Sequence, residues 1–392
     1  MRNSLLTQTR QFADEIRSWR RALHARPELS GREGNTARFI AKQLRRIGLT
    51  PAEHVGNAYG LTADLHVNDQ PAIALRADFD ALPIQEETGA DYASTAPGVM
   101  HACGHDAHTA MLLGAARLLQ QHKARLRRSV RLIFQPHEEL FPGGALAMIA
   151  GGALEGVAAI FGIHVCTNLQ IGEVGTRPGA FMAAVNPFQM VVTGKGGHAA
   201  MPDQCVDPVV AAAQIVVALQ TIVSRSIPIT EPAVVSVTQL QAGTADNVIP
   251  NQATLCGTIR TFDEAVRTHV CDQVREMAMG VAKAHRATAD VHISPGYPVL
   301  MNDADLTQRA LDAARSVGID ERRLLTLAPQ GGGEDFAYYC QRVPGSFVFL
   351  GAANEAKDCV YPHHHPRFSI DEDVLPWGAA LHAQFALANP AG

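Results

Sequence analysis

The sequence lacks the features that would assign it to a specialised class of protein. No unbroken apolar run reaches the length of a membrane-spanning helix, and residues 1–20 lack the apolar core of a signal peptide. An excess of basic residues is also missing, since the formal net charge is −5, which argues against nucleic acid or an anionic membrane surface as a partner. The seven cysteines are an odd number spread through the chain and do not resemble a disulfide framework. We therefore expect a cytoplasmic protein that binds neither membranes nor nucleic acid.

The composition that remains is that of an ordinary globular protein, with 47% hydrophobic and 18% charged residues. A length of 392 residues fits two domains. In residues 1–185 and 299–392, short apolar runs alternate with helical patterns, which predicts a doubly wound, mostly parallel α/β sheet. Residues 186–298 follow the order strand, helix, strand, strand, helix, strand of a ferredoxin-like unit. The sequence therefore predicts a discontinuous catalytic domain with an inserted α+β domain.

The apolar spacing also predicts where the elements of the two domains lie. The first domain is expected to have strands at 72–75, 130–134, 159–165 and 346–351, and helices at 4–47 with a break at Pro27, 107–121, 145–150, 305–317 and 376–387. The insertion is expected to have strands at 188–194, 233–241, 253–260 and 288–293, and helices at 208–225 and 263–285.

Ionisable side chains follow the ends of the expected parallel strands. Asp78 and Asp80 follow the first strand, Glu138 and Glu139 follow the second, and His164 lies at the end of the third. In an open α/β sheet, ligands bind beyond the carboxyl ends of the strands. Because ionisable groups there do not help to form a core, a shared pocket explains them better than several separate turns.

Two histidine-rich motifs contain further side chains that could bind a metal ion. His101–His108 places Cys103 and His105 directly before an expected helix, and three consecutive histidines occupy His363–His365. A thiolate and neutral imidazoles are natural ligands of zinc and related divalent ions. We expect the helix N-terminus to lower the pKa of Cys103. Together these groups predict a metal-dependent hydrolase.

The adjacent acids Glu138 and Glu139 suit such chemistry, because neighbouring residues at a strand end point in different directions. One carboxylate can bind metal while the other takes the proton of the attacking water; an ordinary acidic turn is the alternative interpretation. A glycine-rich turn that ends in His198 lies in the insertion. It lacks the Lys-Ser ending of a phosphate-binding loop, so a nucleotide site is not indicated.

Taken together, these segments resemble the metal-dependent amidohydrolase and metallopeptidase family of hippurate hydrolases, N-acyl-amino-acid amidohydrolases, auxin-conjugate hydrolases, and related aminoacylases and carboxypeptidases. The resemblance covers nearly the whole chain. It rests on Trp19–Leu29, Arg76–Pro83, Met100–His108, Phe134–Glu139, Gly162–His164, Gly196–Pro202, Asn247–Pro250, Gly257–Arg260 and Gly333–Phe336. The Cys-Gly-His-Asp and Glu-Glu motifs in this order are its most specific part.

The resemblance implies a pair of divalent metal ions, manganese or zinc. It implies that the ions are held by Cys103, His105, Glu139, His164 and His364. His364 is chosen because it matches the family's His-x-Pro-x-Phe pattern, which leaves open whether His363, His365 or the extra imidazole of His137 takes part. Asp80 is expected to orient one of the ligand histidines without binding the metal itself.

The same resemblance implies roles for groups that touch the substrate. Glu138 matches the family's general base, and His198 matches the histidine that stabilises the tetrahedral oxyanion. Asn247 and Arg260 fall where the family contacts the substrate or its carboxylate. The insertion would act as a lid that completes the site on closure, and as the surface of a homodimer or a higher homo-oligomer.

The implied activity is hydrolysis of the amide bond of a small N-acyl amino acid by a metal-activated water. Hippurate-like, N-acetyl and similar conjugates, and dipeptides, all fit this description. Three alternatives stay open: a metallo-aminopeptidase or carboxypeptidase that acts on short peptides, a cysteine hydrolase with Cys103 as its nucleophile, and an inactive metal-binding scaffold.

Overall fold

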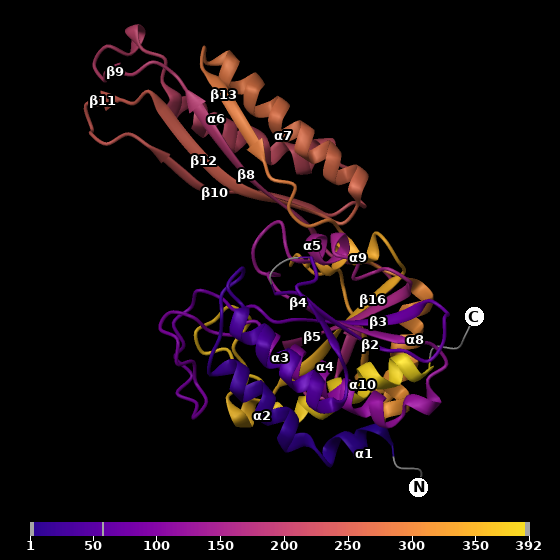
Figure 1. The fold of residues 1–392 in the computed structure, drawn as a ribbon. Coiled ribbons are helices and arrows are strands. Elements are labelled where there is room, and N and C mark those ends of the chain that lie inside the picture. The colour runs from indigo at the N-terminus through magenta and orange to yellow at the C-terminus, as the bar shows by residue number, and fades with distance from the viewer. Residues whose placement is uncertain (1–3, 57–58, 389–392) are drawn as a thin grey trace. The chain divides into compact units, whose positions relative to one another are not determined.

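The computed structural model describes residues 4–56 and 59–388 and divides the chain into two compact units (Figure 1). The first unit comprises Met1–Gly179, Met301–Ala328 and Asp335–Gly392, and the second comprises Ala180–Leu300 and Pro329–Glu334. The second unit therefore begins and ends a few residues outside the predicted insertion, 186–298. It also takes up residues 329–334, which the sequence pattern did not assign to it.

The first unit is built on an eight-stranded sheet with the order β1-β2-β4-β3-β5-β16-β6-β15. Its strands are β1 (Pro51–Glu53), β2 (Leu61–Leu65), β3 (Ala72–Asp78), β4 (Val130–Gln135), β5 (Val157–Gln170), β6 (Val174–Thr176), β15 (Leu324–Thr326) and β16 (Gly345–Ala353). The central strands β4, β3, β5 and β16 are parallel to one another, and the strands that flank this group, β2 and β6, pair with it antiparallel. This large, mostly parallel sheet confirms the predicted α/β class. The short antiparallel strands β1 and β2 at one edge were not predicted.

Helices cover this sheet. They are α1 (Leu5–Arg10), α2 (Ala13–His24), α3 (Gly34–Ile47), α4 (His105–Gln121), α5 (Ala145–Ala150), α8 (Ala304–Val317), α9 (Phe336–Cys340) and α10 (Leu375–Ala388). Helix α4 is buried along most of its length because α2, α3 and α10 all pack against it. Its first residue, His105, is therefore held rigidly, and Cys103 and Gly104 directly precede the helix.

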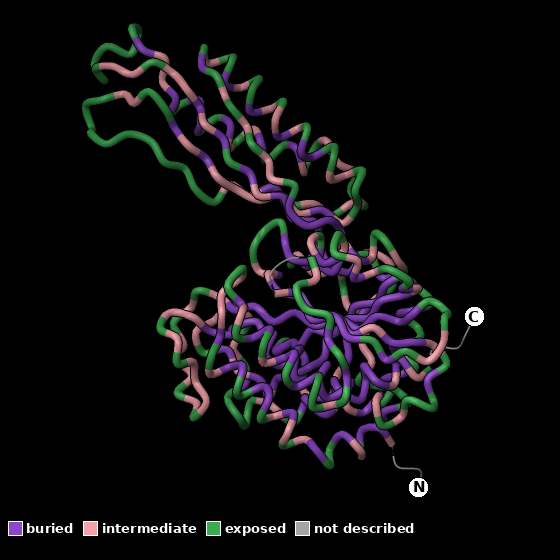
Figure 2. The backbone as a smooth tube through the Cα atoms, viewed as in Figure 1, coloured by how far each residue is buried: buried purple, intermediate pink, exposed green. Residues whose placement is uncertain are grey.

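The second unit contains a four-stranded antiparallel sheet with the order β10-β12-β8-β13. Its elements are β7 (Gly179–Met182), β8 (Ala184–Thr193), β9 (Gly197–His198), α6 (Pro208–Thr221), β10 (Ala233–Ala242), β11 (Val248–Ile249), β12 (Gln252–Thr261), α7 (Glu264–Ala284) and β13 (Thr288–Ile293); β14 (Leu300–Asn302) pairs with β7. The sequence of β8, α6, β10, β12, α7 and β13 is the expected ferredoxin-like order. Its central strand β8 alternates between buried and more exposed residues over much of its length, whereas the central strands β3 and β16 of the first unit are buried throughout (Figure 2).

Helix α6 differs from its prediction in two ways. The α-helix ends at Thr221 and continues as a π-helical turn to Ser226. Among the described residues, Pro208–Ser226 is the single helical stretch that is long and apolar enough to cross a membrane, although no run of that length was predicted. Ala211, Ile215 and Leu219 are buried in the core of the second unit. A core helix of a folded domain passes the same length and composition test, so this is weak evidence for a membrane span.

Candidate metal centre

The candidate site lies at the carboxyl ends of β3 and β4 and beside the middle of their neighbour β5. The prediction that His164 ends its strand is wrong, because β5 continues to Gln170 by pairing with β16. Asp78 at the end of β3 pairs with Gln135 at the end of β4, and Arg76 of β3 pairs with Gly162 of β5. The residues that follow these positions are therefore neighbours in space. This register delivers the side chains of Asp80, Glu138, Glu139 and His164 to one edge of the sheet.

The motif before α4 reaches the same edge because of Gly104. This residue has a φ of +87°, which glycine adopts without strain. A Cβ atom here would lie 2.4 Å from Cγ2 of Val165. Glycine thus allows the backbone between Cys103 and His105 to approach β5, where His164 lies.

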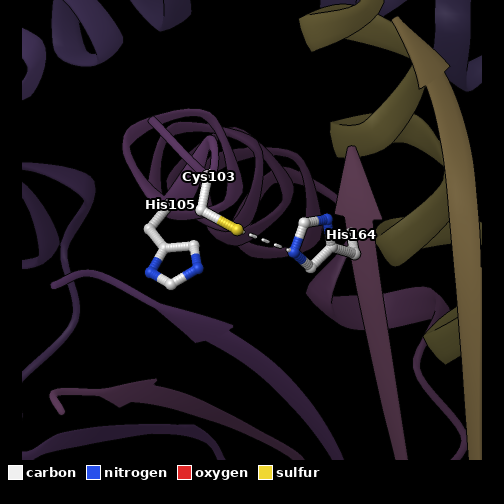
Figure 3. Close-up of side chains that lie close together, drawn as sticks. All are labelled: Cys103, His105 and His164. Carbon is white, nitrogen blue, oxygen red and sulfur yellow. Dashed lines mark hydrogen bonds between the residues drawn. The ribbon is translucent and has the colours of Figure 1, made fainter. Parts of the chain in front are cut away.

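Cys103, His105 and His164 form the first group of candidate ligands (Figure 3). One donor atom from each lies within 4.8 Å of the others. The Cys103 Sγ atom is 3.4 Å from Nε2 of His164. The Nε2 atom of His105 is buried and has no hydrogen-bond partner in residues 4–56 and 59–388, which is costly unless something else binds it.

Glu139 connects this group to two others. It shares one group with Cys103 and His364, and another with His105 and Glu138. Its Oε2 atom is 3.5 Å from Nε2 of His364, and its Oε1 atom is 3.8 Å from Nε2 of His105. The Oε1 atom is also buried, and no residue that the structure describes makes a hydrogen bond to it. Groups that share members in this way suit two ions side by side.

The donor set fits divalent metal ions. It combines a thiol, imidazoles and a carboxylate, which are the ligands of zinc and related ions. Two of its buried polar atoms, on His105 and Glu139, lack hydrogen-bond partners among the described residues. A cation between these atoms would satisfy both of them.

Among the three consecutive histidines of the described chain, only His364 belongs to a candidate ligand group. Its backbone has a φ of +65°, and its N–H donates to the carbonyl of Ala102, 2.8 Å away. His363 instead directs Nε2 towards the carbonyl of Val165, and Nδ1 of His365 accepts the N–H of Arg367. This geometry supports the choice of His364. His137, at a φ of +63°, belongs to no such group in the described chain.

Asp80 lies behind the candidate ligands, as expected. Its Oδ1 atom is 3.2 Å from Nδ1 of His105, and its Oδ2 atom accepts the N–H of Glu139 and the hydroxyl of Ser30. Burial opposes its ionisation, but the hydrogen bond and charge of His105 lower its pKa below the usual value. The ionised Asp80 therefore directs Nε2 of His105 towards the cluster.

The expected effect of the helix N-terminus on Cys103 is wrong. Burial first, and then the charges of Glu139, Glu138 and Asp78, raise the pKa of this thiol well above its ordinary value. For His105, burial alone would lower the pKa, but Asp78 and Asp80 raise it to about 10. A protonated, buried Cys103 is a poor nucleophile, which weakens the cysteine-hydrolase alternative.

A buried ion pair beneath the cluster was not anticipated. Arg76 donates to Asp78 at 2.6 Å, to Gln135 at 3.0 Å and to Asp335 at 2.8 Å. Burial raises the pKa of Asp335 to about 6, although Arg76 opposes this effect. This network could have been predicted from the sequence, because Arg76 lies within an apolar strand and a buried arginine needs a buried partner.

The second unit does not bring all its candidate residues together. His198 on β9 pairs with Val248 of β11, and the carbonyl of Asn247 accepts the N–H of Ala199, so His198 and Asn247 are neighbours. Arg260 lies near the other end of β12, about 27 Å from Gln252 at a rise of about 3.4 Å per residue. The His198 turn is attached at the Gln252 end, through Asn251. One small molecule therefore cannot touch both ends of the same sheet.

Arg260 nevertheless has the character of a ligand-binding residue. It is half-buried, no carboxylate pairs with it among the described residues, and burial lowers its pKa. His198 is exposed, and its Nδ1 atom accepts the N–H of Ala200 at 3.1 Å. This hydrogen bond leaves Nε2 of His198 as the nitrogen that can donate to another molecule.

Comparison with known proteins supports the metal chemistry. Residues 74–388 match the model of peptidase family M20/M25/M40. The chain is 39% identical to thermostable carboxypeptidase 2 of Saccharolobus solfataricus, covering 98% of both chains. It is 41% identical to an N-acetylcysteine deacetylase of Bacillus subtilis, covering 96% of this chain and 97% of the relative. It is 40% identical to the IAA-amino acid hydrolase ILR1-like 2 of Arabidopsis thaliana, covering 98% and 89%.

A solved structure gives the same result. The YXEP protein of Bacillus subtilis, described as a dinuclear metal binding peptidase of the M20 family, superposes with a TM-score of 0.84. It is 37% identical to this chain, and the match covers 96% of this chain and 98% of that one. The similarity includes the segments that carry the cluster described above.

Proposed function

This chain belongs to peptidase family M20/M25/M40 and is a metal-dependent amidohydrolase or peptidase; from that premise we propose that it hydrolyses the amide bond of N-acyl amino acids. The observation that carries the proposal is Glu138. This carboxylate is 7% exposed and shares a group with His105 and Glu139, while the two groups that contain Cys103 are complete without it. A surplus buried acid beside a metal cluster is the group that amide hydrolysis requires and a structural metal site does not.

The proposed ligands are Cys103, His105, Glu139, His164 and His364. Bound there, two divalent ions would supply Lewis acidity and a water of lowered pKa. Glu138 would accept the proton of the water that attacks the amide carbonyl, and would then deliver that proton to the departing nitrogen. Asp80 holds His105 in place throughout. We propose zinc or manganese as the ions.

Residues of the second unit are proposed to bind the substrate. Nε2 of His198 donates to the developing oxyanion, and Asn247 lies beside it. The guanidinium of Arg260 suits the free carboxylate of the amino acid, because it is half-buried without a partner. The separation of His198 from Arg260 agrees with a homodimer in which the two residues at one site come from different copies. The exposed edge strand β10 offers a surface for such pairing.

The names of the relatives support this substrate class, since they include an N-acetylcysteine deacetylase and an IAA-amino acid hydrolase. Carboxypeptidases of similar identity favour short peptides as a second candidate substrate. All seven cysteines are free thiols, which agrees with a reducing, cytoplasmic location.

The test is release of free amino acid from N-acetyl, N-benzoyl and indoleacetyl amino acids, with dipeptides and N-blocked peptides in parallel. Each reaction is run with chelator and after return of zinc or manganese. We expect turnover of the N-acyl amino acids that chelator abolishes and metal restores, and weak turnover when an amide replaces the substrate carboxylate. Turnover of peptides alone would favour the peptidase candidate, and turnover that resists chelator would contradict both.

A further inference from the structure

Three imidazoles surround the backbone of one residue, Val165. Its N–H donates to Nε2 of His108 at 2.9 Å. Its carbonyl oxygen accepts from Nδ1 of His164 at 2.6 Å and from Nε2 of His363 at 3.0 Å. His108 lies in a donor group with Asp78 and His105, whereas His363 belongs to no such group among the described residues.

The strand topology explains why the backbone of Val165 is available to side chains. Strand β5 pairs with β3 only as far as Gly162, opposite Arg76. On its other edge, β5 continues to pair with β16 through Val165. Beyond the end of β3, the N–H and carbonyl of Val165 have no strand partner on that side and must be satisfied in another way. The imidazoles of His108, His164 and His363 supply the missing partners.

These hydrogen bonds define the tautomers. The Nε2 atom of His108 accepts a proton from a backbone amide, so its proton is on Nδ1, which donates to Asp78 at 2.6 Å. A carbonyl only accepts, so His164 carries its proton on Nδ1 and keeps the lone pair of Nε2 free. That Nε2 atom is the one that faces Cys103, as Figure 3 shows. His108 itself has no free lone pair and cannot be a metal ligand.

His108 is rigidly held from the side away from Val165. It is 1% exposed, and the Asp78 carboxylate that it contacts is fully buried and accepts from Arg76 at 2.6 Å. The ring of His108 lies 4.5 Å from that of His164, at an interplanar angle of 67°. A buried ion pair, an imidazole and a backbone amide thus form a continuous chain that ends at a candidate ligand.

His363 ties the second candidate ligand to the same carbonyl. It directly precedes His364, whose N–H is fixed on the carbonyl of Ala102. The ring of His363 packs against that of His164 at 5.0 Å and against Phe368 at 5.2 Å. The carbonyl of Val165 is therefore a shared support for His164 and for the turn that carries His364.

We propose that His108 and His363 are positioning residues, which act through the backbone of Val165 to orient His164 and His364 for metal binding. This inference rests on the proposed function, because it assumes that these two histidines are ligands. Groups that orient a ligand histidine in this way usually change metal affinity by about 10- to 100-fold when they are removed.

The test uses the full chain, stripped of metal and titrated with Co²⁺ alone, with the visible absorption spectrum and the dissociation constant as readouts. A matched pair of variants separates the two hydrogen bonds of His108. In His108→Gln, the side-chain oxygen replaces Nε2 as acceptor for Val165. In His108→Asn, the amide still reaches Asp78 but not Val165.

We expect His108→Gln to keep the wild-type spectrum, and His108→Asn to weaken Co²⁺ binding by about 10- to 100-fold with an altered spectrum. The control is His382→Asn. This buried histidine of the same unit packs against Phe161, and its Nδ1 atom has no hydrogen-bond partner. Its replacement should lower the unfolding temperature without changing the Co²⁺ spectrum. Wild-type binding by His108→Asn would overturn the proposal.

His363 provides a second test, which does not depend on the folding of the His108 variants, because this residue is only half-buried. His363→Gln retains a donor for Val165, and His363→Leu removes it, so only the leucine variant should alter the spectrum. Identical spectra for these two variants would overturn the role of His363. If the wild-type chain bound no Co²⁺, the proposed function itself would fail, and this outcome is distinct from unaltered variants of a metal-binding protein.

Discussion

The two units present their candidate residues in opposite ways. In the first unit, strand ends and the start of α4 bring Cys103, His105, Glu139 and His164 into one buried cluster. In the second, His198 is exposed at one end of an antiparallel sheet and Arg260 is half-buried near the other. In a parallel sheet the carboxyl ends of all strands lie at one edge, so the residues that follow them are close together. In an antiparallel sheet the carboxyl ends alternate between the two edges, so such residues are far apart. The first unit can therefore assemble the metal cluster from its own residues. In the second unit, His198 and Arg260 of one copy are too far apart to bind the same small molecule.

The largest expected effect comes from replacing Glu138, the proposed base, as opposed to Glu139, a proposed metal ligand. Glu138→Gln removes the proposed base but no ligand, so we expect kcat to fall by about 10²- to 10⁴-fold while metal content is unchanged. Glu139→Gln removes a ligand, so metal content itself should fall. Metal analysis beside initial rates measures both variants, with the exposed Glu355→Gln as control.

Either of two results would contradict the roles proposed for Glu138 and Glu139. If Glu138→Gln lost its metal and Glu139→Gln kept it, the two roles would be exchanged. Full activity in Glu138→Gln would mean that the surplus carboxylate is structural.

The next prediction addresses the dispersed residues of the second unit. His198→Ala should lower kcat by about 10²- to 10³-fold, as loss of an oxyanion donor does. Arg260→Ala should mainly raise KM, since it removes contacts to a charged group worth about 1.5–3 kcal/mol each. When two differently tagged variants are co-expressed and the mixed dimer is purified, we expect about half the wild-type activity, because one of its two sites is complete.

Each variant purified alone is the reference for that experiment. An inactive mixed dimer would show that His198 and Arg260 of one copy serve the same site, against the separation along β12. Failure of the two tagged chains to purify together would contradict the homodimer.

Sequence patterns predicted the central parallel strands, because apolar runs are local features. They did not predict that β5 continues to Gln170, or the short parallel pair of β6 and β15, since both depend on pairing with distant strands. The assembly of Asp80, Glu139 and His164 follows from that topology. The raised pKa of Cys103 did not follow, since it depends on burial and on carboxylates from other strands. The roles of His108 and His363 were also hidden, because they depend on β3 ending before β5 does. The distance from His198 to Arg260 required the register of β12, which no local pattern reports.

The smallest expected effect concerns acid stability, which should also differ between the units. His382 on α10 of the first unit is 1% exposed, and burial, followed by the nearby His108, lowers its pKa to about 3. In the unfolded chain its pKa is about 6.5. The unfolded state therefore binds the proton more tightly, so stability falls as the pH drops from about 6.5 towards 3, by about 1.4 kcal/mol per pH unit.

His382→Leu removes this titration, so its free energy of unfolding should decline less steeply than that of the wild type between pH 6.5 and 4. The matched control is His292→Leu in the second unit, whose side chain is exposed on β13. Urea unfolding in the presence of chelator measures the slopes without interference from metal release, and hydrogen exchange at pH 5 locates the loss. Protection should be lost first in the first unit, since His382 is buried there and burial lowers its pKa. Equal slopes for the wild type and His382→Leu would mean that His382 is protonated in the folded state, and that acid does not distinguish the two units through this residue.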